Sequence, residues 1–339
     1  MYLLRKLPIK HPNSLSIPKT LAARFYTNQT LDRSSFPDEP TSAYYDELTN
    51  NAARSGDLET ILVLFNKRRR DGCFPTTDTF KFLTNTESSR SSLITLVQTL
   101  IRVDKGLARN TAFESLIARL CKLGWIDDAL QVLDAMSIGD CRFTAFSFYP
   151  ILQALTKKGK VEEAWRVMER MREVGVPPDL TAYNYFLTSH CYDGNLTAAS
   201  EVMKRIEEEG LGTDARTYDA LVLGACRAGK VAGALMVLGK MVDDGFHVMY
   251  CTHVHVIKAL LKLGYYDQAV RFVLIFAGKD EKLDTESFGV LAHKLITCGR
   301  LDEAKRVLEE MVKRGLKMGA KLSKFYESEC KEVKCSQIP

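Results

Sequence analysis

Residues 180–214 read LTAYNYFLTSHCYDGNLTAASEVMKRIEEEGLGTD. Two segments with apolar residues at helical spacing flank the turn cluster Asp193-Gly194-Asn195, and Gly210 lies where a left-handed helix cap is expected. The stretch therefore predicts a hairpin of two helices joined by a tight turn. Because isolated helices of about 12 residues are marginal in water, this hairpin needs neighbours of the same kind.

The same pattern recurs along the chain with a period of about 35 residues, a length typical of helical repeats. A glycine occupies each turn, and an alanine follows it in the second helix, where the two helices touch. The glycines are Gly124, Gly159, Gly194, Gly229, Gly264 and Gly299, and the alanines are Ala129, Ala164, Ala199, Ala234, Ala269 and Ala304. This period predicts an all-α fold, a right-handed α-solenoid superhelix of about eight helix-turn-helix repeats.

The boundaries of the repeats follow from the same register. The repeats are expected at 42–76, 77–109, 110–144, 145–179, 180–214, 215–249, 250–284 and 285–319. The second repeat is degenerate, because residues 87–92 (ESSRSS) replace its turn. Residues 320–339 are rich in Lys, Glu and Ser and are expected to form a polar capping helix and a tail.

The start of the chain differs from the repeats in composition. Residues 1–26 are basic, with Ser and Thr scattered between the basic residues, and no acidic residue precedes Asp32. This composition is typical of organellar transit peptides, so we expect a mitochondrial transit peptide that is cleaved after Tyr26, and then a linker over 27–41. A plastid transit peptide and a plain basic tail are the alternatives. No apolar run approaches the length of about 20 residues that spans a membrane, so no membrane partner is expected.

The charge of the chain is balanced outside this leader. The whole chain has 47 Lys and Arg residues against 42 Asp and Glu residues. The leader supplies the entire excess through Arg5, Lys6, Lys10, Lys19 and Arg24. Any affinity for nucleic acid must therefore come from cations placed in a pattern and not from bulk charge.

Short motifs inside the repeats resemble those of a known family. Residues 159–164 read GKVEEA, residues 299–304 read GRLDEA, and residues 176–179 read VPPD. Contiguous hairpins with these motifs resemble pentatricopeptide repeats over 42–319, in particular the uniform P subclass found mostly in plant organelles. Tetratricopeptide repeats match less well, because their tryptophan–leucine–glycine opening is missing and the period here is one residue longer.

The resemblance implies that the protein binds single-stranded RNA in a concave groove, with about one base per repeat. In the family, the fifth and the last residues of a repeat contact the base edge. In 180–214 these are Asn184 and Asp214, a pair associated with pyrimidines, and an amide can present a donor and an acceptor together. Further candidates for base contact are Asp219, at the fifth place of the next repeat, and Thr181, at the second place of 180–214. The alternative role for Asp214 is to cap the helix that follows it.

A basic residue recurs at the end of the first helix in five repeats. These residues are Arg54, Lys122, Lys157, Arg227 and Lys262. The resemblance implies that they contact RNA phosphates, and cations at fixed spacing would form a charged track. The alternative is that each one interacts with the negative end of its own helix dipole, a role compatible with the first.

The sequence contains no pattern that indicates catalysis or metal binding. Cys121, Cys191 and Cys226 share one repeat position on the buried side of the first helix, so packing explains them. No zinc-deaminase signature of His-x-Glu with Pro-Cys-x-x-Cys occurs, and the glycines are turn residues, not a phosphate-binding loop. We therefore expect no enzymatic activity, no metal, no cofactor and no small-molecule substrate.

Two functions fit these observations. The first is non-catalytic binding of single-stranded RNA in an organelle, in support of RNA processing, stability or translation. The alternative is a protein-binding scaffold, such as a subunit bound to the mitochondrial ribosome, which needs shape and scattered charge instead of a reading code. A helical solenoid presents an extended surface suited to either partner.

Overall fold

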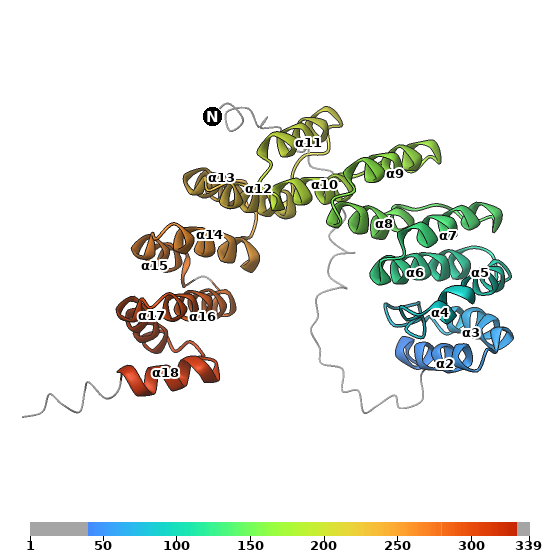
Figure 1. Cartoon of the computed structure of the whole chain (residues 1–339), viewed down its shortest axis with the longest axis horizontal. Coiled ribbons are helices and arrows are strands. Elements are labelled where there is room, and N and C mark those ends of the chain that lie inside the picture. Colours follow the sequence, from blue (N-terminus) through green and yellow to red (C-terminus); the bar gives the residue numbers. More distant parts are fainter. Residues whose placement is uncertain (1–39, 279, 331–339) are drawn as a thin grey trace, which may run out of the picture. The chain divides into compact units, whose positions relative to one another are not determined.

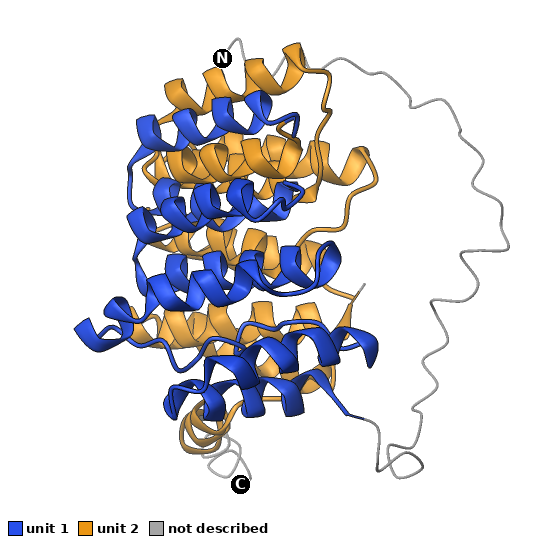
Figure 2. Cartoon of the chain, turned by 90° about the vertical axis from the view of Figure 1, so that its right-hand side faces the viewer, with its two compact units in different colours: residues 1–177 blue, residues 178–339 orange. Residues whose placement is uncertain are grey.

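The computed structural model describes residues 40–278 and 280–330, and these fall into two compact units that divide after Pro177 (Figures 1 and 2). The expected transit peptide and most of the expected linker lie outside the described residues. Where the structure describes the chain, it is built from helices and turns without a strand. The expected all-α architecture of stacked helical hairpins is thereby confirmed within each unit.

The first unit contains three regular hairpins and one irregular repeat. Its helices are α2 (Ser42–Arg54), α3 (Leu58–Arg70), α4 (Glu87–Ser91), α5 (Leu93–Ile101), α6 (Leu107–Leu123), α7 (Ile126–Ile138), α8 (Ala145–Lys157) and α9 (Val161–Glu173). Helices α2 and α3, α6 and α7, and α8 and α9 pair as hairpins, and α6 packs against α8. Helix α5 packs between α3 and α7, so these three helices stay in contact even though the repeat at 77–109 has no regular first helix.

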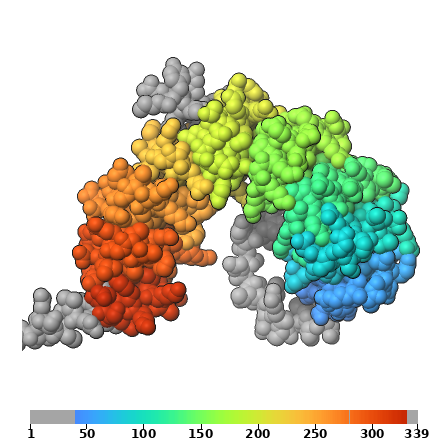
Figure 3. Space-filling view, viewed as in Figure 1, coloured from blue at the N-terminus to red at the C-terminus, as the bar shows by residue number. Residues whose placement is uncertain are grey.

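The second unit continues the same arrangement without an irregular repeat. Its helices are α10 (Leu180–Tyr192), α11 (Leu196–Glu208), α12 (Ala215–Arg227), α13 (Val231–Asp243), α14 (Tyr250–Lys262), α15 (Tyr266–Phe276), α16 (Glu281–Thr297), α17 (Leu301–Lys313) and α18 (Ala320–Cys330). The first helices α10, α12, α14 and α16 and the final α18 contact one another in order, and each second helix packs on its own first helix. The hairpins of this unit form a continuous packed surface from yellow to red in Figure 3.

The sequence explains why each hairpin forms. Gly194 adopts a φ of 72° between α10 and α11, and Gly210 adopts 67° after α11, conformations that favour glycine. Asp214 begins α12 by accepting a hydrogen bond from the backbone N–H of Thr217 at 2.8 Å. The repeated alanine, such as Ala234, is completely buried where the two helices of a hairpin meet.

In three hairpins a tyrosine of the first helix is hydrogen bonded to an acid that ends the second helix. The Tyr183 hydroxyl donates to Glu209 Oε1 at 3.1 Å, and Tyr45 and Tyr218 donate in the same way to Asp71 and Asp244. Burial, reinforced by the neighbouring carboxylate, raises the pKa of Tyr45 and of Tyr218 to about 12. These tyrosines are therefore neutral donors at physiological pH and tie the two ends of the hairpin together.

The repeat at 77–109 has an irregular first half. Residues 87–91, which replace the usual turn, form helix α4, and Thr86 begins this helix by accepting a hydrogen bond from the N–H of Ser89. The preceding residues 77–82 make turns instead of a first helix. Side chains of neighbouring helices satisfy this backbone, because Asn50 Oδ1 accepts from the N–H of Phe82 at 2.6 Å and Arg119 donates to the carbonyl of Leu83.

Candidate nucleic-acid interface

The two residues that the resemblance assigns to base contact are brought together between consecutive first helices. Asn184 Nδ2 donates to Asp214 Oδ1 at 3.1 Å, and the Thr217 hydroxyl donates to Asn184 Oδ1 at 2.9 Å. Asn184 is only 6% exposed. Since an amide has two N–H donors and two acceptor lone pairs, one donor and one acceptor of Asn184 remain beyond these two bonds. Asp214 also caps α12, so the capping role is confirmed alongside this contact.

The same contact recurs in other repeats. The fifth residue of a repeat bonds a hydroxyl near the start of the next first helix: Glu114 accepts from Thr144 at 2.6 Å, and Asp219 accepts from Thr252 at 2.6 Å. The sequence analysis missed the hydroxyl at the third place of the repeats. It is present at Thr79, Ser147, Thr217, Thr252 and Ser287. Its recurrence at the repeat period was the signal that could have identified it.

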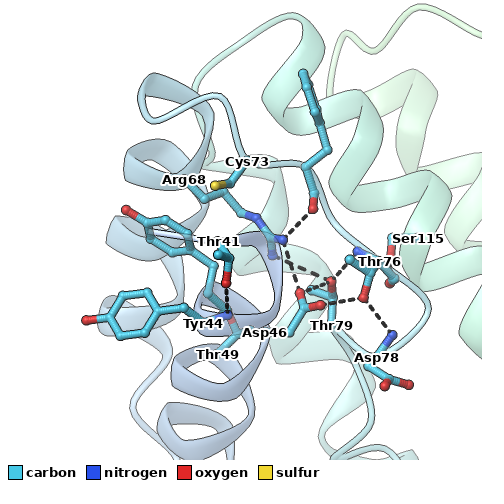
Figure 4. A network of polar contacts seen from close by, with 12 residues as sticks. Thr41, Tyr44, Asp46, Thr49, Arg68, Cys73, Thr76, Asp78, Thr79 and Ser115 are labelled. Atoms are coloured by element: carbon cyan, nitrogen blue, oxygen red, sulfur yellow. Dashed lines mark hydrogen bonds and ion pairs between the residues drawn. The ribbon is translucent and has the colours of Figure 1, made fainter. Parts of the chain in front are cut away.

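In the first repeat the fifth residue is closed off by a buried ion pair (Figure 4). Asp46 Oδ1 lies 3.0 Å from Arg68 Nη2, and the Arg68 side chain is 1% exposed. Thr79 donates to the same carboxylate oxygen at 2.5 Å, and Arg68 also donates to the carbonyl of Phe74. Burial lowers the pKa of Arg68, while the charge of Asp46 opposes that shift. The Asp46 carboxylate is thus saturated by protein groups.

The other two candidates for base contact have different surroundings. Asp219 Oδ1 lies 3.9 Å from His255 Nε2, and its side chain is 19% exposed. Burial lowers the pKa of His255, and the charge of Asp219 opposes this shift. Thr181 is half-buried in the first turn of α10, three residues before Asn184. The structure therefore brings Asn184 and Asp214 into contact, whereas Asp219 belongs to the next inter-repeat cluster.

Of the five candidate phosphate ligands, three have no partner. Lys122, Lys157 and Lys262 are exposed in the last turn of α6, α8 and α14, and none makes a hydrogen bond or ion pair within the described residues. Arg54 instead donates to Asn51 Oδ1 at 2.7 Å, and Arg227 donates to the carbonyl of Tyr192 at 2.7 Å. The three lysines can therefore meet an anion without breaking an existing contact.

Three cysteines of the first helices share one repeat position. Burial raises the pKa of Cys121, Cys191 and Cys226 to about 12, so these thiols are protonated near neutral pH and are poor nucleophiles. No group of three or more His, Cys, Asp or Glu residues within 40–278 and 280–330 could hold a metal ion. In the same ranges, no helix has the length and apolar character required to cross a bilayer.

Comparison with known proteins identifies the family. Residues 82–206 match the model for a pentatricopeptide repeat-containing protein, and residues 216–246 and 286–316 match the model for a single such repeat. A mitochondrial pentatricopeptide repeat-containing protein of Arabidopsis thaliana is 48% identical over 330 residues, which cover 96% of this chain and 94% of the relative. The chain belongs to the pentatricopeptide repeat family.

A second relative supports the same conclusion and bears on localisation. It is another mitochondrial pentatricopeptide repeat-containing protein of Arabidopsis thaliana, 50% identical over 328 residues that cover 96% of this chain and 92% of the relative. Both relatives are named mitochondrial, which confirms the mitochondrial localisation expected for this pentatricopeptide repeat protein over the plastid alternative.

Solved structures of the family are more distant. A crystal structure of a maize pentatricopeptide repeat protein is 21% identical, with a TM-score of 0.44, and the match covers 81% of this chain and 45% of that one. A structure of a pentatricopeptide repeat protein in complex with an RNA element is 16% identical, with a TM-score of 0.46, and covers 88% of this chain and 50% of that one. This chain thus spans about half the length of these solved proteins.

Proposed function

We propose that this protein binds single-stranded RNA along the layer of its first helices and acts without catalysis in mitochondrial RNA processing, stability or translation. One observation carries the proposal. Exposed lysines without a partner recur at one repeat position (Lys122, Lys157 and Lys262), and Lys122 shares its helix with Glu114, whose carboxylate accepts from Thr144 at the boundary with the next repeat. Cations at a fixed period can follow a phosphate backbone even though the chain is almost neutral outside its leader.

The exposed lysines and the residues near Asn184 would have different roles in RNA binding. The lysines would neutralise phosphates and release counterions, a contribution that does not depend on sequence. Asn184, held in place by Asp214 and Thr217, would present its remaining donor and acceptor to one pyrimidine. Thr181 lies three residues earlier in the same helix and would contact the same base. This division matches the general rule that phosphate contacts position a strand while base contacts specify it.

The first test removes the three free lysines. The full chain with Lys122→Ala, Lys157→Ala and Lys262→Ala is expected to bind a single-stranded RNA more weakly, and the slope of log K against log salt should fall by about 2 units, since each contact contributes about 0.7. Fluorescence anisotropy over a salt series measures both quantities. A matched control removes three exposed cations from second helices, Arg166, Lys204 and Lys313. An equal loss of slope in this control would show that the position of the lysines is irrelevant.

The second test concerns base reading. Asn184→Ala should abolish base preference at a single position of a bound strand, worth about 1–3 kcal/mol of discrimination by analogy with other base contacts. Selection from a randomised RNA pool with the full chain measures that preference position by position. Thr197→Ala is the control, because Thr197 is exposed on the second helix α11 and its loss leaves Asn184 and both of its hydrogen-bond partners in place. An unaltered preference profile for Asn184→Ala would favour the protein-binding scaffold as the function.

A further inference from the structure

One position of the basic column holds an aromatic residue. The column lies at the end of the first helix, at the position of Lys157 in α8 and of Arg227 in α12, and in α10 this position holds Tyr192. Tyr192 is 58% exposed. An exposed aromatic ring offers its π-face to a neighbouring cation or to another ring.

Arg227 and Tyr192 form a stacked pair. The guanidinium carbon of Arg227 lies 4.4 Å from the centroid of the Tyr192 ring, and Arg227 Nε donates to the carbonyl of Tyr192 at 2.7 Å. The backbone bond fixes the orientation of the guanidinium plane. Within the described part of the chain, neither terminal nitrogen of Arg227 makes a hydrogen bond or an ion pair. The pair is thus held in place while its outer surface stays open.

The packing of α10 on α12 produces this pair. Gly224 has no side chain, and a Cβ atom there would lie 2.7 Å from Cys191 Sγ and 3.2 Å from Cys191 Cα. The two helices therefore approach closely near their C-terminal ends, one residue before Tyr192 and three residues before Arg227. Gly194 lies beside the end of α12, because a Cβ atom at its position would be in ordinary van der Waals contact with Arg227 Cβ, at 3.6 Å.

We infer that Tyr192 and Arg227 form a stacking platform for one nucleobase of a bound single strand, a role that rests on the proposed RNA-binding function. Arginine and tyrosine planes both stack on bases irrespective of base identity. The free terminal nitrogens of Arg227 would at the same time face the adjoining phosphate. Lys258 and Lys262 of the next first helix are exposed and would continue the phosphate contacts. The platform would therefore anchor the strand without reading its sequence.

The test separates stacking from charge. The full chain is titrated with an oligouridylate and with an otherwise identical strand in which every nucleotide is abasic. Tyr192→Ser should weaken binding of the oligouridylate by roughly tenfold, as expected for one stacked base, and should leave binding of the abasic strand and the salt slope unchanged. Tyr192→Phe keeps the ring and should retain the affinity. Tyr265→Ser removes a tyrosine of similar exposure, 49%, outside the column, and should have no effect.

Two results would overturn the inference, and they are distinguishable. If the wild-type chain binds the oligouridylate while Tyr192→Ser binds both strands with unchanged affinity, the platform is wrong and the proposed RNA-binding function stands. If the wild-type chain binds neither strand at low salt, the proposed function fails and the platform fails with it. A selective loss of oligouridylate binding in Tyr192→Ser supports the platform, provided that thermal unfolding shows the variant to be folded.

Discussion

Replacement of Arg68 by alanine is expected to destabilise the first hairpin by about 3–5 kcal/mol, because it leaves a buried carboxylate without its counter-ion. The Arg68 side chain is 1% exposed and that of Asp46 is 7% exposed, so water cannot take over the role of the guanidinium. The loss is expected to be local. Hydrogen exchange of the full chain should show faster exchange in α2 and α3, while α10 to α17 keep their protection.

The controls for this prediction lie in the same helix. Arg69 is the next residue and is exposed, so Arg69→Ala should change the free energy of unfolding by less than about 0.5 kcal/mol. The double change Arg68→Met with Asp46→Leu removes both charges and should recover much of the lost stability, since apolar residues can replace a buried ion pair at little cost. Similar losses in Arg68→Ala and Arg69→Ala would show that the ion pair does not support the hairpin.

The buried ion pair between Arg68 and Asp46 also limits which repeats can contact an RNA base. Asp46 occupies the place that Asn184 occupies in the repeat at 180–214, but its carboxylate is already bound by Arg68, Thr76 and Thr79. A base would have to displace a desolvated arginine to reach it. We therefore expect base reading to depend on later repeats such as 180–214 and not on the first hairpin.

The fold was predictable because its signals are local and repeat. A turn glycine, a buried alanine and, in most first helices, an aromatic recur with one period, so each repeat supports the assignment of its neighbours. The burial of Arg68 was not predictable in this way. It lies in a run of four cations, residues 67–70, and only the packing of α3 on α2 decides which of them meets Asp46, a residue 22 positions away.

The candidate site was predictable in part. The repeat period places Asn184 beside Asp214, and the structure brings them together. The sequence could not indicate that Asn184 would be nearly buried or that Tyr192 would stack on Arg227. Both features depend on the distance between the first helices α10 and α12. Gly224 has no side chain and lies where these two helices are closest, so it sets that distance.

The second large effect is expected at this crossing. Gly224→Val should destabilise the second unit by about 3 kcal/mol, the upper range for adding side-chain atoms to a packed core. The cause is steric, because the new Cβ would lie 2.7 Å from Cys191 Sγ and 3.0 Å from Cys191 Cβ. Urea unfolding of the full chain measures the change. Gly224→Ala should cost less, because alanine gains up to about 1 kcal/mol of helix propensity over glycine.

A glycine in the neighbouring second helix provides the opposite case. Gly239 in α13 is exposed, and a Cβ atom there would meet nothing within 4 Å, so Gly239→Ala should stabilise the protein by up to about 1 kcal/mol.

Cys191→Ala should rescue Gly224→Ala only in part, because it removes the sulfur while Cys191 Cα stays 3.2 Å from the added methyl group. If Gly224→Ala and Gly239→Ala shift the unfolding midpoint in the same direction, helix propensity governs both sites and the close approach of α10 to α12 is wrong. Opposite shifts would establish the approach, and Gly224→Val should then also reduce binding of an oligouridylate, because separating the helices removes Arg227 from the Tyr192 ring.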